Sequence, residues 1–174
     1  MLDDCYSFFP HLPDLPQHYA DEAIHLAEYT TYHVVPISGI KVNTTQSKTS
    51  FENTNFIKDL LKKFGHARTH YLRVDGMHSY DWHVDSARRA GIIFLLNDVG
   101  NAVTLFKEQI DERNSRIIKV PYTLLRPTLL DVTKSHCVIN LSDQPRYALT
   151  VGFDLDVSYQ QVKDFLINYS TQQY

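Results

Sequence analysis

The chain has 174 residues, 43% of them hydrophobic and 21% charged, so it is long enough to bury a core without help from disulfides. A formal net charge of −3 and the absence of any lysine or arginine run argue against a nucleic-acid partner. The two cysteines, Cys5 and Cys137, are too few for a disulfide framework, and no apolar run reaches the about 18 residues of a membrane helix. We expect one soluble, cytoplasmic domain over residues 1–174, with no membrane partner.

The first third of the chain predicts little regular structure. Pro10, Pro13 and Pro16 lie among aromatic residues in the first twenty positions, a composition that favours an extended arm over a helix or strand. Residues 41–50 (KVNTTQSKTS) are polar and favour a loop. We therefore expect residues 1–52 to form an N-terminal arm followed by loops.

Residues 53–65 predict a helix. Asn53 or Thr54 suits the N-cap, and Gly65 suits the position just after the last turn. The helical spacing of apolar residues predicts one buried face, which comprises Phe56, Ile57, Leu60, Leu61 and Phe64. This face should pack against a sheet.

Residues 66–154 change to short β-prone runs separated by turn residues. The predicted strands cover about residues 67–74, 81–84, 90–97, 102–107, 116–122, 128–132, 136–141 and 146–154. The separators are too short for helical crossovers, so the sheets should be mostly antiparallel. We predict a mainly β fold, a jelly roll with flanking helices, the last of them over 158–170.

His83 and Asp85 form the first candidate ligand pair. Residues two apart in a strand point to the same side, so these two side chains can present a nitrogen and an oxygen to one point inside a barrel. His136, at the start of a later predicted strand, is the candidate third ligand. Two histidines and one carboxylate on one face of a metal are the ligand set of non-haem Fe(II) oxygenases.

Arg146 follows ten residues after His136, across the turn SDQP. If residues 141–145 or their inner three form a hairpin loop, Asn140 faces Arg146 and both His136 and Arg146 lie on one face; a loop of even length would turn Arg146 away. In the favourable register a five-carbon diacid spans the gap, with its 2-oxo acid group on iron and its distal carboxylate on the guanidinium. That diacid is 2-oxoglutarate.

This set of residues, on eight strands preceded by a helix, resembles the Fe(II)- and 2-oxoglutarate-dependent dioxygenases. The segments HVDSARRAGIIFLL and LLDVTKSHCVINLSDQPRYALTVGF are similar to small aspartyl/asparaginyl β-hydroxylase-like members, and the resemblance covers residues 66–154. It implies a double-stranded β-helix with iron near its open end. It also implies that dioxygen and 2-oxoglutarate are used to hydroxylate an amino acid, a peptidyl side chain or another small substrate, with release of succinate and CO2.

Two departures from the family pattern bear on the site. Many members carry a hydroxyl residue two positions after the arginine to help hold the distal carboxylate, whereas this chain has Ala148 there. Tyr71 is a candidate replacement donor, with core packing as its alternative reading. The animal β-hydroxylases of the aspartyl/asparaginyl group lack the acidic ligand that Asp85 would supply, so their peptide substrates do not carry over.

Two further features surround the candidate triad. Arg88 and Arg89 follow the pair, and on a strand that starts there one of them faces the cavity, although geometry alone does not choose between them. We favour Arg88 because it resembles a residue of small relatives, and assign it to a carboxylate of 2-oxoglutarate or substrate, with a structural ion pair as the alternative. The segment 75–81 (DGMHSYD) suits a movable lid over the site.

Two rival functions remain at this level. One is a jelly-roll module that binds metal without catalysis, and the other is a cupin-like metalloenzyme that needs no 2-oxoglutarate. The position of Arg146 argues against both.

Overall fold

The computed structural model describes residues 5–29, 33–34, 41–43, 55–65 and 67–169. Most of these residues lie in two antiparallel sheets and three helices. The strands are β1 (Tyr6–Phe8), β2 (His33–Val34), β3 (Lys41–Asn43), β4 (Ala67–Val74), β5 (His78–His83), β6 (Ala90–Leu95), β7 (Ala102–Gln109), β8 (Ser115–Lys119), β9 (Pro127–Asp131), β10 (His136–Asn140) and β11 (Arg146–Phe153). The helices are α1 (Gln17–Tyr29), α3 (Asn55–Phe64) and α4 (Tyr159–Tyr169).

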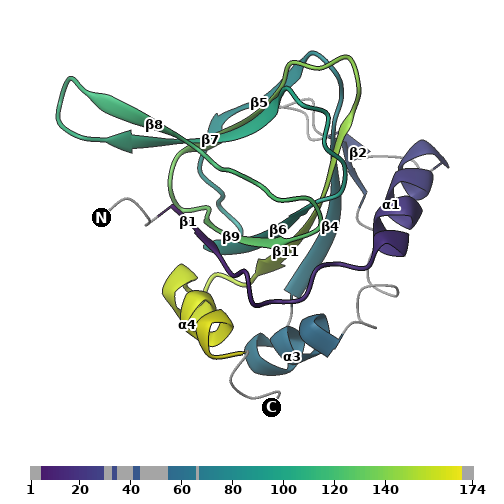
Figure 1. Cartoon of the computed structure of the whole chain (residues 1–174). Coiled ribbons are helices and arrows are strands. Elements are labelled where there is room, and N and C mark those ends of the chain that lie inside the picture. The colour runs from purple at the N-terminus through teal and green to yellow at the C-terminus, as the bar shows by residue number, and fades with distance from the viewer. Residues whose placement is uncertain (1–4, 30–32, 35–40, 44–54, 66, 170–174) are drawn as a thin grey trace.

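The strands form two facing sheets, which confirms the predicted jelly roll. Within the described residues the larger sheet has the order β1-β9-β6-β11-β4-β3-β2 and the smaller one the order β5-β10-β7-β8. The paired strands are antiparallel, as the short separators predicted. Figure 1 shows the two sheets enclosing the barrel interior, the helices covering the outside of the larger sheet, and the β7–β8 ribbon projecting beyond the barrel.

Alternation along the strands divides the larger sheet into two faces. Leu149 and Phe94 face the helices and pack with Ile57 of α3 and Leu166 of α4. Ala148, one residue away from Leu149, faces the barrel interior and packs in the second cluster with residues such as Ile93, Phe106, Leu130 and Val132. Because successive side chains of a strand point to opposite faces, one sheet closes both cores.

Helices α3 and α4 follow their sequence signals. The buried residues of α3 are Phe56, Ile57 and Leu60, all on the predicted stripe. Gly65 adopts a φ of +74° directly after the helix, and its N–H donates to the carbonyl of Leu61 at 2.8 Å. The predicted cap residues 53 and 54 lie outside the described residues. At α4, Ser158 and Gln161 exchange side-chain to backbone hydrogen bonds, which form a capping box.

The expectation of an irregular arm over the first twenty residues was wrong. Residues 6–8 form β1, which pairs with β9, and helix α1 begins at Gln17. Pro16 directly precedes that helix, and proline is tolerated at a helix start because the first N–H groups have no helical partner. The prolines therefore end where the helix begins, and the buried Tyr19 and Ala20 anchor it to the core.

The expected hairpin between the strands of His136 and Arg146 was also wrong. β10 belongs to the smaller sheet and β11 to the larger one, so residues 141–145 carry the chain from one sheet to the other. Arg146 is nevertheless buried, with 4% of its surface exposed, and it shares an alternation face with Ala148, which lines the barrel interior. The side chain therefore reaches the interior from the opposite wall.

Candidate metal centre

His83, Asp85 and His136 come together at one end of the smaller sheet. His83 ends β5 and His136 begins β10, and the two residues are partners in the β5–β10 ladder. Asp85 lies just beyond β5, where its N–H donates to the carbonyl of Val132 at 3.0 Å. One potential ligand atom from each of the three residues lies within 4.8 Å of the others.

The two imidazoles are oriented by main-chain carbonyls. His83 Nδ1 lies 2.7 Å from the carbonyl oxygen of Asp81, and His136 Nδ1 lies 2.9 Å from that of Lys134. A carbonyl oxygen only accepts, so each Nδ1 carries the hydrogen and donates it. Each Nε2 then has its lone pair available. Both Nε2 atoms face Asp85 Oδ1, at 3.3 Å from His83 and 3.9 Å from His136.

The electrostatics of the cluster favour the ligand forms of these side chains. Burial would raise the pKa of Asp85, but its contacts with His83 and Arg88 outweigh burial and hold that pKa well below its usual range. Burial lowers the pKa of His136, helped by the nearby charges of His83 and Arg88. The result is an ionised carboxylate beside a neutral imidazole. His83 Nε2 is buried and makes no well-formed hydrogen bond, and it lies 3.3 Å from Asp85 Oδ1, as two atoms that share one ion would.

Arg88 forms an ion pair with Asp85, which is the alternative role that the sequence left open for it. Its Nε donates to Asp85 Oδ2 at 2.6 Å and its Nη1 donates to Thr150 Oγ1 at 2.7 Å. The expected clamp on a carboxylate of 2-oxoglutarate or substrate is therefore not supported, because the guanidinium is held by the chain's own groups. Arg89 is exposed.

Arg146 forms a second centre in the barrel interior. Its Nη2 donates to Thr104 Oγ1 at 3.3 Å, and its guanidinium carbon lies 5.2 Å from the centre of the Tyr122 ring. Arg146 Nε is buried without a hydrogen-bond partner, and no carboxylate of the described residues lies within ion-pair distance of this arginine. A buried charge without a counter-charge costs several kcal/mol, about 3–5 on removal of a partner. The arrangement indicates an anion site.

The strand register relates the two centres. In the β10–β7 ladder His136 pairs with Phe106, and Val138 pairs with Thr104. Thr104 is therefore two residues, about 7 Å, along the sheet from the level of His136 and on the same face. The guanidinium that contacts Thr104 and the three candidate ligands therefore lie near one another in the same interior.

Tyr71 does not belong to this interior. It is buried in the cluster between the larger sheet and the helices, so core packing, its alternative reading, is what the structure has. The hydroxyls beside Arg146 belong to Thr104 and Tyr122, which hydrogen-bond to each other at 3.1 Å. Burial raises the pKa of the Tyr122 hydroxyl against the lowering effect of the Arg146 charge. No spacing rule linked these two residues to Arg146 in the sequence, because they reach it only through the fold.

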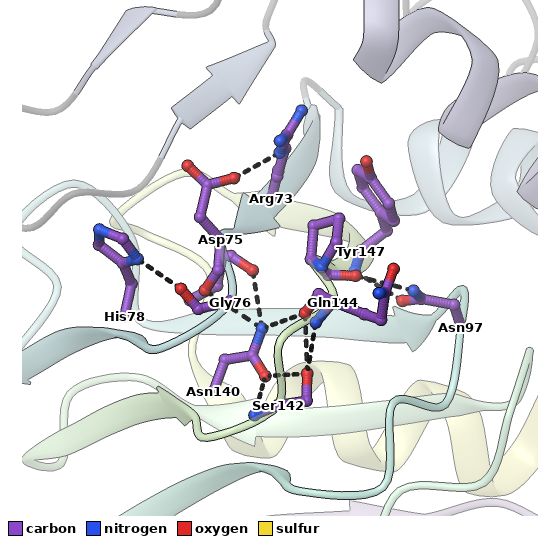
Figure 2. A network of polar contacts seen from close by, with 11 residues as sticks. Arg73, Asp75, Gly76, His78, Asn97, Asn140, Ser142, Gln144 and Tyr147 are labelled. Carbon is purple, nitrogen blue, oxygen red and sulfur yellow. Dashed lines mark hydrogen bonds and ion pairs between the residues drawn. The ribbon is translucent and has the colours of Figure 1, made fainter.

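Asn140 fixes the turn that was expected to be a lid. Figure 2 shows its amide at the centre of a polar network: Nδ2 donates to the carbonyls of Val74, Asp75 and Gln144, at 3.0, 3.2 and 2.8 Å. Its Oδ1 accepts from the backbone and side chain of Ser142. A Cβ added to Gly76 would lie 2.5 Å from the carbonyl oxygen of Asp143. Residues 75–77 are therefore tightly packed against 142–144, and residues 78–81 all belong to strand β5.

None of the helices in the described residues is both long enough and apolar enough to cross a membrane.

Comparisons with known proteins place this geometry in a recognised fold. No protein-family model matches the chain, and no curated protein has a significantly similar sequence. Among solved structures, a prolyl hydroxylase from Trichoplax adhaerens in complex with a hypoxia inducible factor peptide fragment is 13% identical, with a TM-score of 0.66 over 87% of this chain and 84% of that chain. The chain has the fold of the 2-oxoglutarate and Fe(II) oxygenases.

Two further structures share this fold. A prolyl-4-hydroxylase from Pseudomonas putida is 16% identical, with a TM-score of 0.64 over 90% of this chain and 96% of that one. An oxidoreductase of the 2OG-Fe(II) oxygenase family from Burkholderia pseudomallei is 11% identical, with a TM-score of 0.62 over 87% and 86%. None of these three is described as an aspartyl/asparaginyl hydroxylase, so that narrower resemblance stays a prediction.

Proposed function

We propose that the protein is an Fe(II)- and 2-oxoglutarate-dependent dioxygenase that hydroxylates an amino acid, a peptidyl side chain or another small substrate. The observation that carries the proposal is the pairing of two incomplete centres in one barrel. Two imidazoles and one carboxylate converge at one end of the smaller sheet. A buried arginine without a counter-charge contacts Thr104, which lies about two strand residues along that sheet from the level of His136.

The residues present fit an iron ion. Two imidazole nitrogens and one carboxylate oxygen suit Fe(II) and leave further positions open. His83, Asp85 and His136 would hold the ion through His83 Nε2, His136 Nε2 and Asp85 Oδ1. The carbonyls of Asp81 and Lys134 supply the outer contacts that keep both rings in the binding tautomer.

The residues around Arg146 fit the distal carboxylate of 2-oxoglutarate. A guanidinium binds a carboxylate through two parallel hydrogen bonds, and Arg146 has its Nε buried without a partner. Thr104 and Tyr122 place two hydroxyls at the same point, in the role that Ala148 cannot fill.

The chain's contribution to the reaction is binding and exclusion of water. Iron with 2-oxoglutarate supplies the oxidising power, so that substrate C–H, dioxygen and 2-oxoglutarate become substrate C–OH, succinate and CO2. Arg146 would fix the far end of the co-substrate, and the three ligand residues would fix its reacting end. Phe106, Ile93 and Ala148 form an apolar wall beside them, which keeps solvent from the reacting groups.

The rival functions explain less of the site. A static metal module or a cupin-like enzyme independent of 2-oxoglutarate needs the three ligands, but neither gives a reason to bury Arg146 without a counter-charge. A peptide or small molecule remains the proposed substrate, with dioxygen as co-substrate. A cytoplasmic location, in which both buried cysteines stay reduced, completes the proposal.

A spectroscopic experiment tests the proposal. Anaerobic addition of Fe(II) and 2-oxoglutarate to the wild-type protein should produce a weak visible metal-to-ligand absorption band. Arg146→Ala and Arg146→Gln should lose this band while still binding Co(II), because the metal ligands are untouched. Arg126→Ala, which removes only a surface ion pair with Asp14, is the matched control and should keep the band.

Each possible result of that experiment favours a different function. A folded, metal-loaded wild-type protein without the band would favour the non-catalytic module. A band that survives in both Arg146 variants would show that 2-oxoglutarate is held elsewhere. Succinate release with pooled amino acids and peptides then establishes the reaction class, because slow uncoupled turnover produces succinate before the true substrate is known.

A further inference from the structure

We infer that Arg88 is a positioning residue that fixes Asp85 so that one carboxylate oxygen, Oδ1, is presented to the metal. This inference rests on the proposed function, since it assumes an ion at His83, Asp85 and His136. It assigns Arg88 a role toward a ligand of that ion, in place of direct contact with a substrate or co-substrate.

The two oxygens of Asp85 have different surroundings. Oδ2 accepts a hydrogen bond from Arg88 Nε at 2.6 Å, whereas Oδ1 faces the Nε2 atoms of His83 and His136 at 3.3 and 3.9 Å. A carboxylate rotates readily about its last bond when nothing holds it. With Oδ2 held by a charged donor, Oδ1 is the oxygen left for the ion.

Arg88 is itself anchored to the opposite sheet. Its Nη1 donates to Thr150 Oγ1 at 2.7 Å, and Thr150 is 1% exposed in the middle of β11. The guanidinium therefore joins the irregular segment after β5 to the best-packed strand of the larger sheet. The main chain of Asp85 is held by the hydrogen bond from its N–H to the carbonyl of Val132, and this side-chain anchor adds a second fixed point.

Two paired glycines make room for this anchor. Gly91 of β6 and Gly152 of β11 are partners in the sheet. A Cβ on Gly152 would lie 2.8 Å from Arg88 Cδ and 3.0 Å from Nη1, and one on Gly91 would lie 3.3 Å from Nη1. Neither glycine has a positive φ, whereas Gly65 and Gly100 do. Space for the arginine, and not backbone conformation, therefore explains glycine at both positions.

Metal affinity tests the role of Arg88 directly. Co(II) is titrated into metal-free protein and followed by calorimetry and by its visible absorption. Arg88→Gln should weaken binding by about 10- to 100-fold, as loss of an outer contact to a ligand does, and Arg88→Lys should recover part of it. Arg89→Gln is the matched control, because Arg89 is the exposed neighbour, and its affinity should stay within about twofold of wild type.

A double-mutant cycle separates positioning from general damage. Gly152→Ala should weaken Co(II) binding although it touches no ligand, and Gly91→Ala should do so less, following the two clash distances. In an Arg88→Ala background Gly152→Ala should have no further effect on affinity, because the group it displaces is gone. Thermal unfolding of each variant confirms that the folded protein is being titrated.

The outcomes distinguish this inference from the proposed function. If wild type binds no Co(II), or His136→Ala binds it as tightly as wild type, the metal site itself is wrong. If wild type binds Co(II) and Arg88→Gln binds it equally well, only the role of Arg88 is overturned. An equal effect of Gly152→Ala in both backgrounds would overturn it too, since the glycine would then act independently of Arg88.

Discussion

Arg146 is buried without a carboxylate among the described residues, whereas Arg73, Arg88 and Arg116 each pair with one. Charge burial of this kind persists when a ligand supplies the missing partner. The ring of Tyr122 covers the guanidinium, which lessens the cost through a cation–π contact but does not satisfy Nε. This difference between the arginines is what supports the proposed binding role of Arg146.

At the residue scale, Tyr122→Phe should weaken 2-oxoglutarate binding about tenfold, because it removes one hydroxyl donor beside the anion, worth about 1.5 kcal/mol. Co(II) affinity should not change. The measurement is the Kd for 2-oxoglutarate by titration of the visible band. Tyr159→Phe, which loses a hydrogen bond to Ser7 outside the barrel, is the control. Equal affinities in wild type and Tyr122→Phe would exclude the hydroxyl from the site.

At this scale, the sequence predicted those site residues that are close in the chain or lie at a predicted strand end. His83 and Asp85 are two apart, and His136 begins a strand that the β-prone run HCVINL predicts. Thr104 and Tyr122 were missed because they meet Arg146 only through pairing of β7 with β10 and closure of the barrel. The partner of Arg88 was open for the same reason, since Thr150 lies on a distant strand.

At the element scale, β10 and the segment 141–145 connect the two centres. β10 carries His136 at its start and Asn140 at its end, and Asn140 holds the turn after β4 and the approach to β11. Val74, whose carbonyl accepts from Asn140, is also the strand partner of Arg146. One side chain thus ties the ligand strand to the position of the arginine.

Asn140→Ala should lower the free energy of unfolding by about 3 kcal/mol, because the buried carbonyl of Val74 and the partly buried carbonyls of Asp75 and Gln144 lose this donor. Asn140→Asp should destabilise the fold at least as much at neutral pH. It keeps the shape of the side chain but places a carboxylate oxygen, which repels, next to three carbonyl oxygens. Urea unfolding measures both. Asn101→Ala, at an exposed position, should change stability by less than about 0.5 kcal/mol. A small effect of both Asn140 variants would contradict the bracing role.

At this scale, the sequence predicted the core strands correctly but not their connections or the first helix. Short β-prone runs between turn residues predicted the core strands, because the strands of the larger sheet are buried along most of their length. Such runs do not report which sheet a strand joins, so the step from β10 to β11 was predicted as a hairpin when it is a crossing between sheets. Helix α1 was missed because the three prolines before it predicted an extended chain, and that prediction was carried past the last proline to residues that form the helix.

At the scale of the whole molecule, the fold is one barrel with helices on a single side. The apolar cluster beneath the helices stabilises the larger sheet, which leaves the inner face of that sheet to carry polar groups such as Thr150 and Arg146. Within the described residues, the barrel interior therefore holds polar groups that a ligand can satisfy, among them Arg146 Nε. Ligands that satisfy these groups should stabilise the whole fold.

Thermal unfolding checks this linkage. With Fe(II) or Co(II) bound, 2-oxoglutarate at about 100 times its Kd should add about 2.7 kcal/mol, which for a chain of this size raises Tm by about 5 to 10 °C. Chelation of the metal should abolish most of this rise, because the 2-oxo acid end then has no ligand. Arg146→Ala should abolish it as well. An equal rise with and without metal would contradict a site that spans both centres.

The candidate iron ligands come mainly from the smaller sheet, while the guanidinium of Arg146 comes from the larger one. An acid held at both ends must therefore match the separation of the two walls, and one methylene more or fewer leaves one end unbound. The packing of Phe106 and Ile93 between those walls sets this separation. Substitutions there, at residues that bind neither the ion nor the acid, would change which length of oxo-diacid the protein accepts.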